Sequence, residues 1–392
     1  MHIRQRHLKP IAKFSIPYLF FSIGIAAVST IWSVYMNSFL NNSSLVGFLT
    51  SIFIVLEVLA YIFLIPMIEK RNKVKLLIIC LLFFAVSYLL FSVYSNIFLV
   101  IILGALIAVA TSLRTTANGL IVRDSSESYN VSKNEGIIYA LLNIAWFVGP
   151  LIAGYIASTY GINNVFFFAS AIILLSVIIM NFLKVKDDRK TKDIDKHIFR
   201  MIANFFRDKN RVLIYIISLS VPFWWAFIYV YMPIYIIDSG LSSFTLGLFI
   251  SGVTIPLIFG DYIFARIAGK KGFRKLFFTG FLSLGILAAS LFFISNIYLI
   301  LALLVLASIS VSMIEPTIEA YFLDITEEEE RDKYYGIYTT SSQLGTLIGA
   351  GAAAAFLAFL PFNYLFLLFG IPMVFFAFLS LKIKESYESE KK

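Results

Sequence analysis

Twelve long apolar runs separated by short polar joints constrain this chain of 392 residues more than any other feature. A helix needs about 20 apolar residues to cross the roughly 30 Å hydrocarbon core of a bilayer. Soluble domains carry about a quarter charged residues, whereas 14% of this chain is charged and 60% is hydrophobic. The sequence therefore predicts an all-α polytopic membrane protein. Its twelve transmembrane helices are predicted at 14–37, 45–68, 74–94, 97–122, 136–158, 163–184, 212–236, 245–268, 274–294, 297–323, 335–360 and 363–382.

The basic residues predict how these helices are oriented. Apart from Arg114, all of the 32 Lys and Arg residues lie in 1–13, 70–75, 123–133, 184–211, 266–275, 331–333 and 382–392. The alternate joints carry none: 38–44, 94–97, 158–164, 237–244, 294–297 and 360–363. Cytoplasmic loops of membrane proteins are enriched in Lys and Arg. We therefore expect both termini and the long middle loop in the cytoplasm, in a multi-pass protein of the cell membrane. The net charge of +9 reflects this topology, so no nucleic-acid surface is predicted.

Few residues are suited to covalent or metal chemistry. Cys80 is the only cysteine, which excludes disulfides within the chain and Cys-based metal clusters. His2, His7 and His197 are the only histidines, and all lie in segments predicted to be cytoplasmic. There is no Gly-rich phosphate loop of the P-loop type. We therefore expect no enzyme activity, no cofactor, no metal and no ATP drive.

The two halves of the chain match at an offset of 200 residues. "YSNIFL" at 94–99 aligns with "ISNIYL" at 294–299, and Gly149 aligns with Gly349. Each half has six predicted helices, an even number, so both halves keep the same orientation and are related by an axis along the membrane normal. Two such bundles around a shared cavity are typical of alternating-access transporters.

The repeat predicts an N-terminal six-helix bundle at 1–185, a cytoplasmic linker loop at 186–211 and a C-terminal six-helix bundle at 212–392. Within the linker, "HIFRMIANFF" has the apolar spacing of a helix lying along the membrane surface. A solvated connection between the bundles is the alternative.

This arrangement resembles the major facilitator superfamily (MFS) over essentially the whole chain. A family motif between the second and third helices has a Gly, an acidic residue, a basic residue, a second Gly and further basic residues. "IPMIEKRNKVK" at 65–75 keeps it in part, with Glu69 and Lys70 as the charged pair and Asn72 at the second Gly. Because Asn tolerates a left-handed backbone, we expect Asn72 to substitute for glycine there. The second-half copy "ARIAGKKGFRK" keeps Gly272, Arg274 and Lys275. The resemblance implies a gating role for this loop.

A second family motif, associated with antiporters, falls in the fifth predicted helix. Its positions are occupied by Gly136, Ala145, Gly149, Pro150, Ala153 and Gly154. The resemblance implies antiport. Small residues also let helices approach closely and Pro bends a helix, which gives the same positions a structural role in any transporter. Both interpretations stay open.

Five ionisable residues lie inside the apolar runs: Glu57, Arg114, Asp261, Glu315 and Glu319. A charge at mid-bilayer costs about 2.5–3.5 kcal/mol on insertion scales, so we expect each to face a cavity or a partner. Arg114 shares a helix face with Thr111 and Asn118, and Glu315 shares one with Glu319. In the family, the fourth and tenth helices line the cavity. The resemblance therefore implies that the face with Thr111, Arg114 and Asn118 and the face with Glu315 and Glu319 line the cavity. Further cavity candidates are Trp32, Asn143, Trp225 and Tyr229.

Each charge also has a structural interpretation. Arg114 could pair with Glu57 inside the first bundle, or with Glu315 as a gate. Asp261 could bind Arg266 or a loop amide. As a set, however, the intramembrane positions hold four acids and one base. Carboxylic acids in a low-dielectric environment exchange protons nearer neutral pH than they do in water.

The sequence therefore predicts a monomeric secondary transporter that exchanges protons for a small cationic or amphipathic solute by alternating access in the lipid bilayer. A carrier for sugars or anionic metabolites, with Arg114 as the anion ligand, is the first alternative. A non-coupled protein such as a lipid scramblase or a sensor is the alternative from another class.

Overall fold

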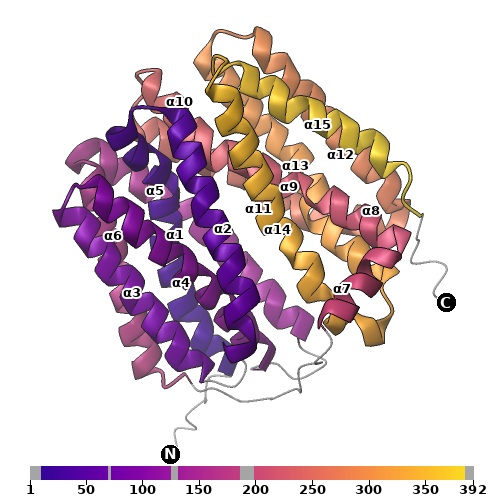
Figure 1. Cartoon of the computed structure of the whole chain (residues 1–392), viewed down its shortest axis with the longest axis horizontal. Coiled ribbons are helices and arrows are strands. Elements are labelled where there is room, and N and C mark those ends of the chain that lie inside the picture. Colours follow the sequence, from indigo (N-terminus) through magenta and orange to yellow (C-terminus); the bar gives the residue numbers. More distant parts are fainter. Residues whose placement is uncertain (1–9, 69–71, 125–130, 186–197, 385–392) are drawn as a thin grey trace, which may run out of the picture. The chain divides into compact units, whose positions relative to one another are not determined.

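The structure is a computed structural model that describes residues 10–68, 72–124, 131–185 and 198–384 (Figure 1). Every regular element in these ranges is a helix. The helices of the first half are α1 (Pro10–Leu40), α2 (Ser43–Ile68), α3 (Lys73–Val93), α4 (Ile97–Asp124), α5 (Val131–Tyr160) and α6 (Ile162–Phe182). Those of the second half are α7 (Ile198–Arg207), α8 (Lys209–Ser218), α9 (Ser220–Ala226), the π-helix η2 (Phe227–Tyr231), α10 (Met232–Asp238), α11 (Ser243–Lys271), α12 (Phe273–Ser290), the 3₁₀-helix η3 (Leu291–Phe293), α13 (Ile297–Ile325), α14 (Glu328–Leu357) and α15 (Tyr364–Ser380).

These elements correspond to the twelve predicted runs. Among the described residues, 10 helical segments are long and apolar enough to cross a membrane, with α8 to α10 together forming one of them. α15 is apolar but has only 17 residues. α14 has 30 residues, and its first half, "EEERDKYYGIYTTSSQ", is too polar to meet the same criterion. The seventh predicted run differs most, because a π-helical turn divides it.

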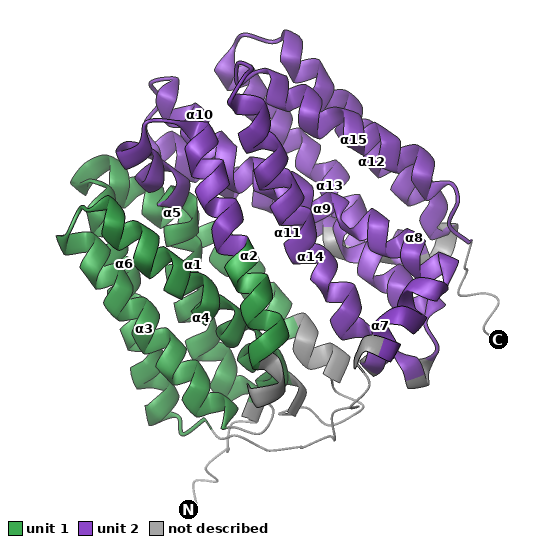
Figure 2. Ribbon diagram, in the orientation of Figure 1, with its two compact units in different colours: residues 1–31, 55–194 green, residues 32–54, 195–392 purple. Residues whose placement is uncertain are grey.

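Residue contacts divide the chain into two compact units, which Figure 2 colours separately. The first comprises 1–31 and 55–194, and the second comprises 32–54 and 195–392. α1 and α2 therefore each contribute to both units. The linear bundle boundaries at 185 and 212 stay a prediction.

Small residues and buried aromatic rings build the core of each unit. In the first unit, α3 packs on α4 and α6, and the Ser170 hydroxyl donates to the Ala85 carbonyl at 2.8 Å. In the second unit, α12 packs on α13 and α15. A Cβ on Gly285 would lie 2.8 Å from the carbonyl oxygen of Gly370. Ser170 and Ala85 are separated from Gly370 and Gly285 by 200 residues, so the same helix contact occurs in both units.

The repeat also recurs at helix starts. The Asn96 side chain accepts from the Phe98 amide at 2.8 Å, and the Asn296 side chain accepts from the Tyr298 amide at 3.0 Å. Both asparagines cap the first turn of their helix and satisfy amides that would otherwise lack a partner. The offset of 200 is therefore visible in local structure as well as in sequence.

α7 lies in the linker and packs into the second unit. Its Phe205 is fully buried, with ring contacts to Tyr215, Phe322 and Tyr334. Arg211, just beyond α7, pairs with Glu330 at 3.0 Å and lies over the Tyr334 ring at 4.3 Å. The described part of the linker thus contacts α13 and α14 through Phe205 and Arg211, while most of the other described side chains of α7 are exposed. Whether the linker lies along the membrane surface or is solvated stays a prediction.

Candidate functional site

Glu315 lies on α13, inside one of the predicted membrane-spanning runs of the second unit. Its Oε1 accepts a hydrogen bond from Nε1 of Trp225 at 3.2 Å. Its Oε2 is buried and has no hydrogen-bond partner among the described residues. Pro316 follows it and cannot donate the helical hydrogen bond to the carbonyl of Ser312. One carboxylate oxygen is therefore free to accept a proton or a ligand.

Trp225 and Tyr229 extend this site along the seventh segment. Their rings lie 5.4 Å apart at 35°. The Tyr229 hydroxyl hydrogen-bonds the Thr254 side chain, and Glu315 acts on Tyr229 electrostatically. Tyr229 belongs to the π-helix η2, and its carbonyl accepts from the Ser33 hydroxyl of α1 at 3.5 Å. Such π-helical turns are frequent at functional sites because they redirect side chains within a helix.

Glu319 lies one turn beyond Glu315 and acts on it electrostatically. Its side chain is exposed, and its Oε1 accepts from the Tyr335 hydroxyl at 2.6 Å. Tyr335 in turn contacts the Tyr338 ring, which stacks on Phe322 at 4.1 Å. Glu315 and Glu319 thus lie one turn apart on α13, and among the described residues only Glu319 accepts a hydrogen bond from a tyrosine hydroxyl.

Arg114, on α4, is the basic cavity candidate and belongs to the first unit. It lies over the Phe84 ring at 5.8 Å, and one terminal nitrogen donates weakly to Thr115 at 3.5 Å. Its Nε is buried without a hydrogen-bond partner in the described part of the chain. Arg114 acts on Glu57 electrostatically, but no hydrogen bond or ion pair joins the two among the described side chains. The pairing of Arg114 with Glu57 is therefore long-range. Because Arg114 and Glu315 belong to different units, their proximity stays a prediction.

The other cavity candidates have varied surroundings. Asn118 is 8% exposed, and its Oδ1 has no partner among the described residues. Asn143 is half-buried on α5. The Trp32 ring contacts Tyr35 at 6.3 Å and belongs to the second unit. The side chain of Asp261 lies outside the described residues, although the preceding Gly260 lies directly against the Ser312 hydroxyl of α13.

The loop motif is described only in part. Glu69 and Lys70 lie outside the described residues. The prediction for Asn72 was wrong: its φ is −69°, and its side chain accepts from the Lys75 amide. Asn72 replaces glycine by capping α3, not by adopting a left-handed backbone.

The second copy of the loop motif behaves differently. Gly272 has φ 84°, a region that favours glycine. Arg274 donates two hydrogen bonds to the carbonyl of Ile383, at 3.2 and 2.7 Å, and so holds the segment after α15. Lys275 is exposed at the first turn of α12.

The antiporter-like motif forms a close helix contact within the first unit. A Cβ on Gly149 would lie 2.8 Å from Cβ of Ala26 and 2.9 Å from the carbonyl of Ile23. Ala145, Pro150 and Gly154 of the motif are buried as well, while the burial of Gly136 lies outside what the structure describes. The small residue Gly149 therefore allows α5 to approach α1 closely, as the structural interpretation of the motif predicts.

The same contact occurs in the second unit. A Cβ on Gly349 would lie 2.9 Å from Cβ of Ala226 and 2.8 Å from the carbonyl of Phe223. All three residues are offset by 200 from Gly149, Ala26 and Ile23. Because the contact is common to both units, it belongs to the repeated scaffold.

Two residues of the site were missed by the sequence interpretation. Tyr335 and Thr254 each bond a predicted site residue, Glu319 and Tyr229 respectively. The chain has 21 tyrosines, and a lone threonine on an apolar helix carries no charge to mark it, so no local pattern singled these two residues out. The one sequence signal for Thr254 was its spacing of seven residues from Asp261, which places both on one face of a helix.

Comparison with known proteins identifies the family. The profile of the Major Facilitator Superfamily matches residues 14–271 and 214–392. Multidrug resistance protein 2 of Bacillus subtilis is 22% identical, over 90% of this chain and 89% of that protein. Quinolone resistance protein NorA of Staphylococcus aureus is 26% identical, over 85% of this chain and 86% of that protein.

Solved structures agree on the fold. A bacterial homologue of the human lysosomal transporter Spinster, in an inward-facing state, superposes with a TM-score of 0.76 at 12% identity, covering 97% of this chain and 98% of that chain. A transporter of the POT family in complex with a thioalcohol-conjugated peptide gives 0.79 at 12% identity, covering 95% of each chain. With the family profile spanning both halves, the chain belongs to the Major Facilitator Superfamily and is a multi-pass secondary transporter, not an enzyme.

Proposed function

We propose that the chain exchanges protons for small cationic or amphipathic organic solutes and so acts as an efflux antiporter. The observation that carries the proposal is the Glu315 carboxylate, held on one oxygen by Trp225 and left with a buried, unpartnered oxygen among the described residues. A buried charge without a full set of partners is costly. Either a proton or an organic cation removes that cost. Since both compete for the same oxygen, binding of one favours release of the other.

The surroundings of Glu315 suit this exchange. Trp225 and Tyr229 present two aromatic rings beside the carboxylate, which can stack on a flat or cationic solute. Glu319 adds a second negative charge one turn away, but the Tyr335 hydroxyl already donates to it. Glu315 is therefore our first candidate for the coupling residue and Glu319 for a modulating one.

The relatives support the efflux class. Two of them are named as multidrug and quinolone resistance proteins, at 22% and 26% identity over most of this chain.

We further propose that both termini and the linker are cytoplasmic, that the six-helix bundles are 1–185 and 212–392, and that the carrier works as a monomer. The distribution of Lys and Arg supports the orientation.

Reconstituted proteoliposomes test the proposal. With the membrane potential clamped by valinomycin and equal potassium, an acidic lumen should drive accumulation of radiolabelled tetraphenylphosphonium in exchange for protons. E315Q keeps the shape of the side chain but cannot release a proton, so accumulation should fall to the level of protein-free liposomes. E327Q is the matched control, because Glu327 is an exposed carboxylate at the start of α14. Full gradient-driven accumulation in E315Q would refute Glu315 as the coupling residue.

One observation favours the alternative, a carrier for anionic solutes. The buried Nε of Arg114 lacks a hydrogen-bond partner among the described residues, and a guanidinium suits carboxylate ligands. Under this alternative, proton-driven uptake of benzoate should occur and should be lost in both R114A and R114K, since lysine lacks the Nε donor. Tetraphenylphosphonium transport that survives R114A while benzoate is not transported by the unmodified protein would exclude it.

A further inference from the structure

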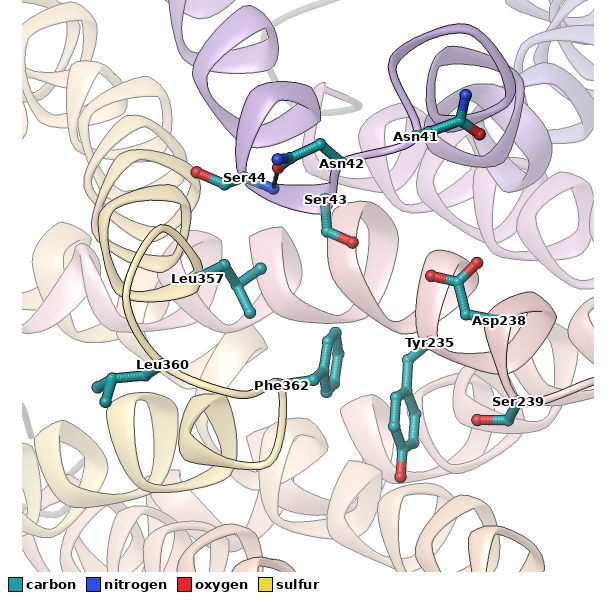
Figure 3. Close-up of a pocket in the computed structure, with 10 residues that line it drawn as sticks. All are labelled: Asn41, Asn42, Ser43, Ser44, Tyr235, Asp238, Ser239, Leu357, Leu360 and Phe362. Carbon is teal, nitrogen blue, oxygen red and sulfur yellow. Dashed lines mark hydrogen bonds between the residues drawn. The ribbon is translucent and has the colours of Figure 1, made fainter.

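A cavity lies at the joints that carry no Lys or Arg, at the ends of the helices away from the basic loops. It has a volume of about 450 Å³, within the range of small-molecule sites. All of its residues belong to the second unit. They come from the turn between α1 and α2, the end of α10 and the joint between α14 and α15: Asn41, Asn42, Ser43, Ser44, Tyr235, Asp238, Ser239, Leu357, Leu360 and Phe362 (Figure 3). We call it the joint pocket.

Asp238 gives the joint pocket its charge. It is the only charged residue in the six joints that carry no Lys or Arg, namely 38–44, 94–97, 158–164, 237–244, 294–297 and 360–363. Its side chain is exposed at the last residue of α10. No hydrogen bond or ion pair engages its carboxylate within the described ranges. None of the lining residues is basic, so the pocket has a net negative charge.

Further oxygen acceptors surround this carboxylate. Figure 3 shows the Ser43 hydroxyl and the Asp238 carboxylate turned toward the same space. Asn41 has φ 46° and holds its exposed amide at the tight turn between α1 and α2. The Asn42 side chain is already engaged, because its Oδ1 accepts from the amides of Ser44 and Leu45 at 2.9 and 3.2 Å. The polar wall thus offers a carboxylate and a hydroxyl.

The opposite wall is apolar. The rings of Tyr235 and Phe362 stack at 4.3 Å and 12°. Leu357 and Leu360 complete this side. An aromatic or aliphatic body fits here, while its charged end lies at Asp238. The pocket therefore has the two-sided chemistry of an amphipathic cation.

We propose that the joint pocket binds a primary organic ammonium with an aromatic body, as a site separate from Glu315. The N–H donors of the ammonium bond Asp238 and Ser43, and the aromatic body packs on Phe362 and Leu357. The positive-inside pattern assigns this end of the molecule to the external face. The site would then hold a solute at the external mouth of the carrier. It requires no proton coupling, so its test is independent of the proposed antiport.

Protection from thiol labelling tests the joint pocket in intact cells. Cys80 is the only cysteine and is buried, so a C80S chain with S239C carries a single reporter in the pocket. A membrane-impermeant maleimide should label it from outside. 2-Phenylethylammonium should slow the labelling, whereas neutral 2-phenylethanol, which has the same body, should not. L360C is the second reporter, in case S239C alters the site.

Two carboxylate variants separate this site from the rest of the protein. D238N should raise the amine concentration for half-protection by about tenfold or more, because charge-assisted hydrogen bonds are lost. E327Q should leave protection unchanged. The proposal is overturned if the amine protects neither reporter, if protection survives D238N, or if the alcohol protects as well as the amine. Labelling only from the cytoplasmic side would overturn the external assignment.

Discussion

Substituting Gly149 by alanine tests whether the antiporter-like motif is first a helix contact. The new Cβ would lie 2.8 Å from Cβ of Ala26 and 2.9 Å from the carbonyl of Ile23. A comfortable carbon–carbon separation is about 3.5 Å, so α5 has to move away from α1 by roughly 0.7 Å. One of the two obstacles is backbone, which cannot rotate out of the way. Overpacking of this kind costs about 1–3 kcal/mol.

The matched control is G119A in the same unit. Nothing lies within 4 Å of a Cβ on Gly119, which is exposed on α4. There the alanine adds helix propensity and should stabilise by about 0.5–1 kcal/mol. The two identical substitutions should therefore shift stability in opposite directions.

Cys80 supplies the assay. It is 3% exposed and is the only cysteine, so a thiol-reactive fluorogenic dye reports when the first unit opens. In a detergent melt, G149A should react at a lower temperature than the unmodified protein, and G119A at the same or a higher one. A G149A protein that melts with or above G119A would refute the close-contact argument. Loss of transport in a G149A protein of unchanged stability would instead favour a direct role of the motif in antiport.

Two further predictions concern stability. N96A and N296A should each destabilise by about 1 kcal/mol, because each removes the same N-terminal cap; hydrogen exchange in the first turns of α4 and α13 checks this, and an effect in only one half would contradict the equivalence of the caps. E330Q should cost less than about 1 kcal/mol, since its pair with Arg211 is partly exposed. R211A should loosen α7 more, because it also removes the contact with the Tyr334 ring. Equal proteolysis of α7 in both variants would contradict this ranking.

The helices of this protein follow from the sequence because their cause is local. An apolar run of sufficient length needs a helix in a bilayer, since every backbone group must be hydrogen-bonded within the segment. The repeat was also detectable, and Gly149 and Gly349 make equivalent contacts on α1 and α9. The seventh segment departs from expectation at the π-helix Phe227–Tyr231, which no apolar pattern marks.

The candidate site was predictable only as a list of residues. Helical spacing placed Glu315 and Glu319 on one face, and the electrostatic interaction between them agrees. Their different partners, Trp225 and Tyr335, come from other helices and depend on packing. The role of Asn72 was misjudged for a related reason: residue preference suggested an unusual backbone, whereas an ordinary backbone with a capping side chain satisfied the helix end.

The sequence by itself determined that this chain crosses a membrane as helices, that its halves repeat, and that a few charges lie where lipid would reject them. Hydrophobic period and charge placement encode these properties residue by residue. Only the tertiary structure decided which oxygen of Glu315 lacks a partner in the described part of the chain. The tertiary structure also brings three separate joints together to form the joint pocket, in which Asp238 is the acidic residue. Contacts between distant helices fix both features, and such contacts leave no local pattern in the chain.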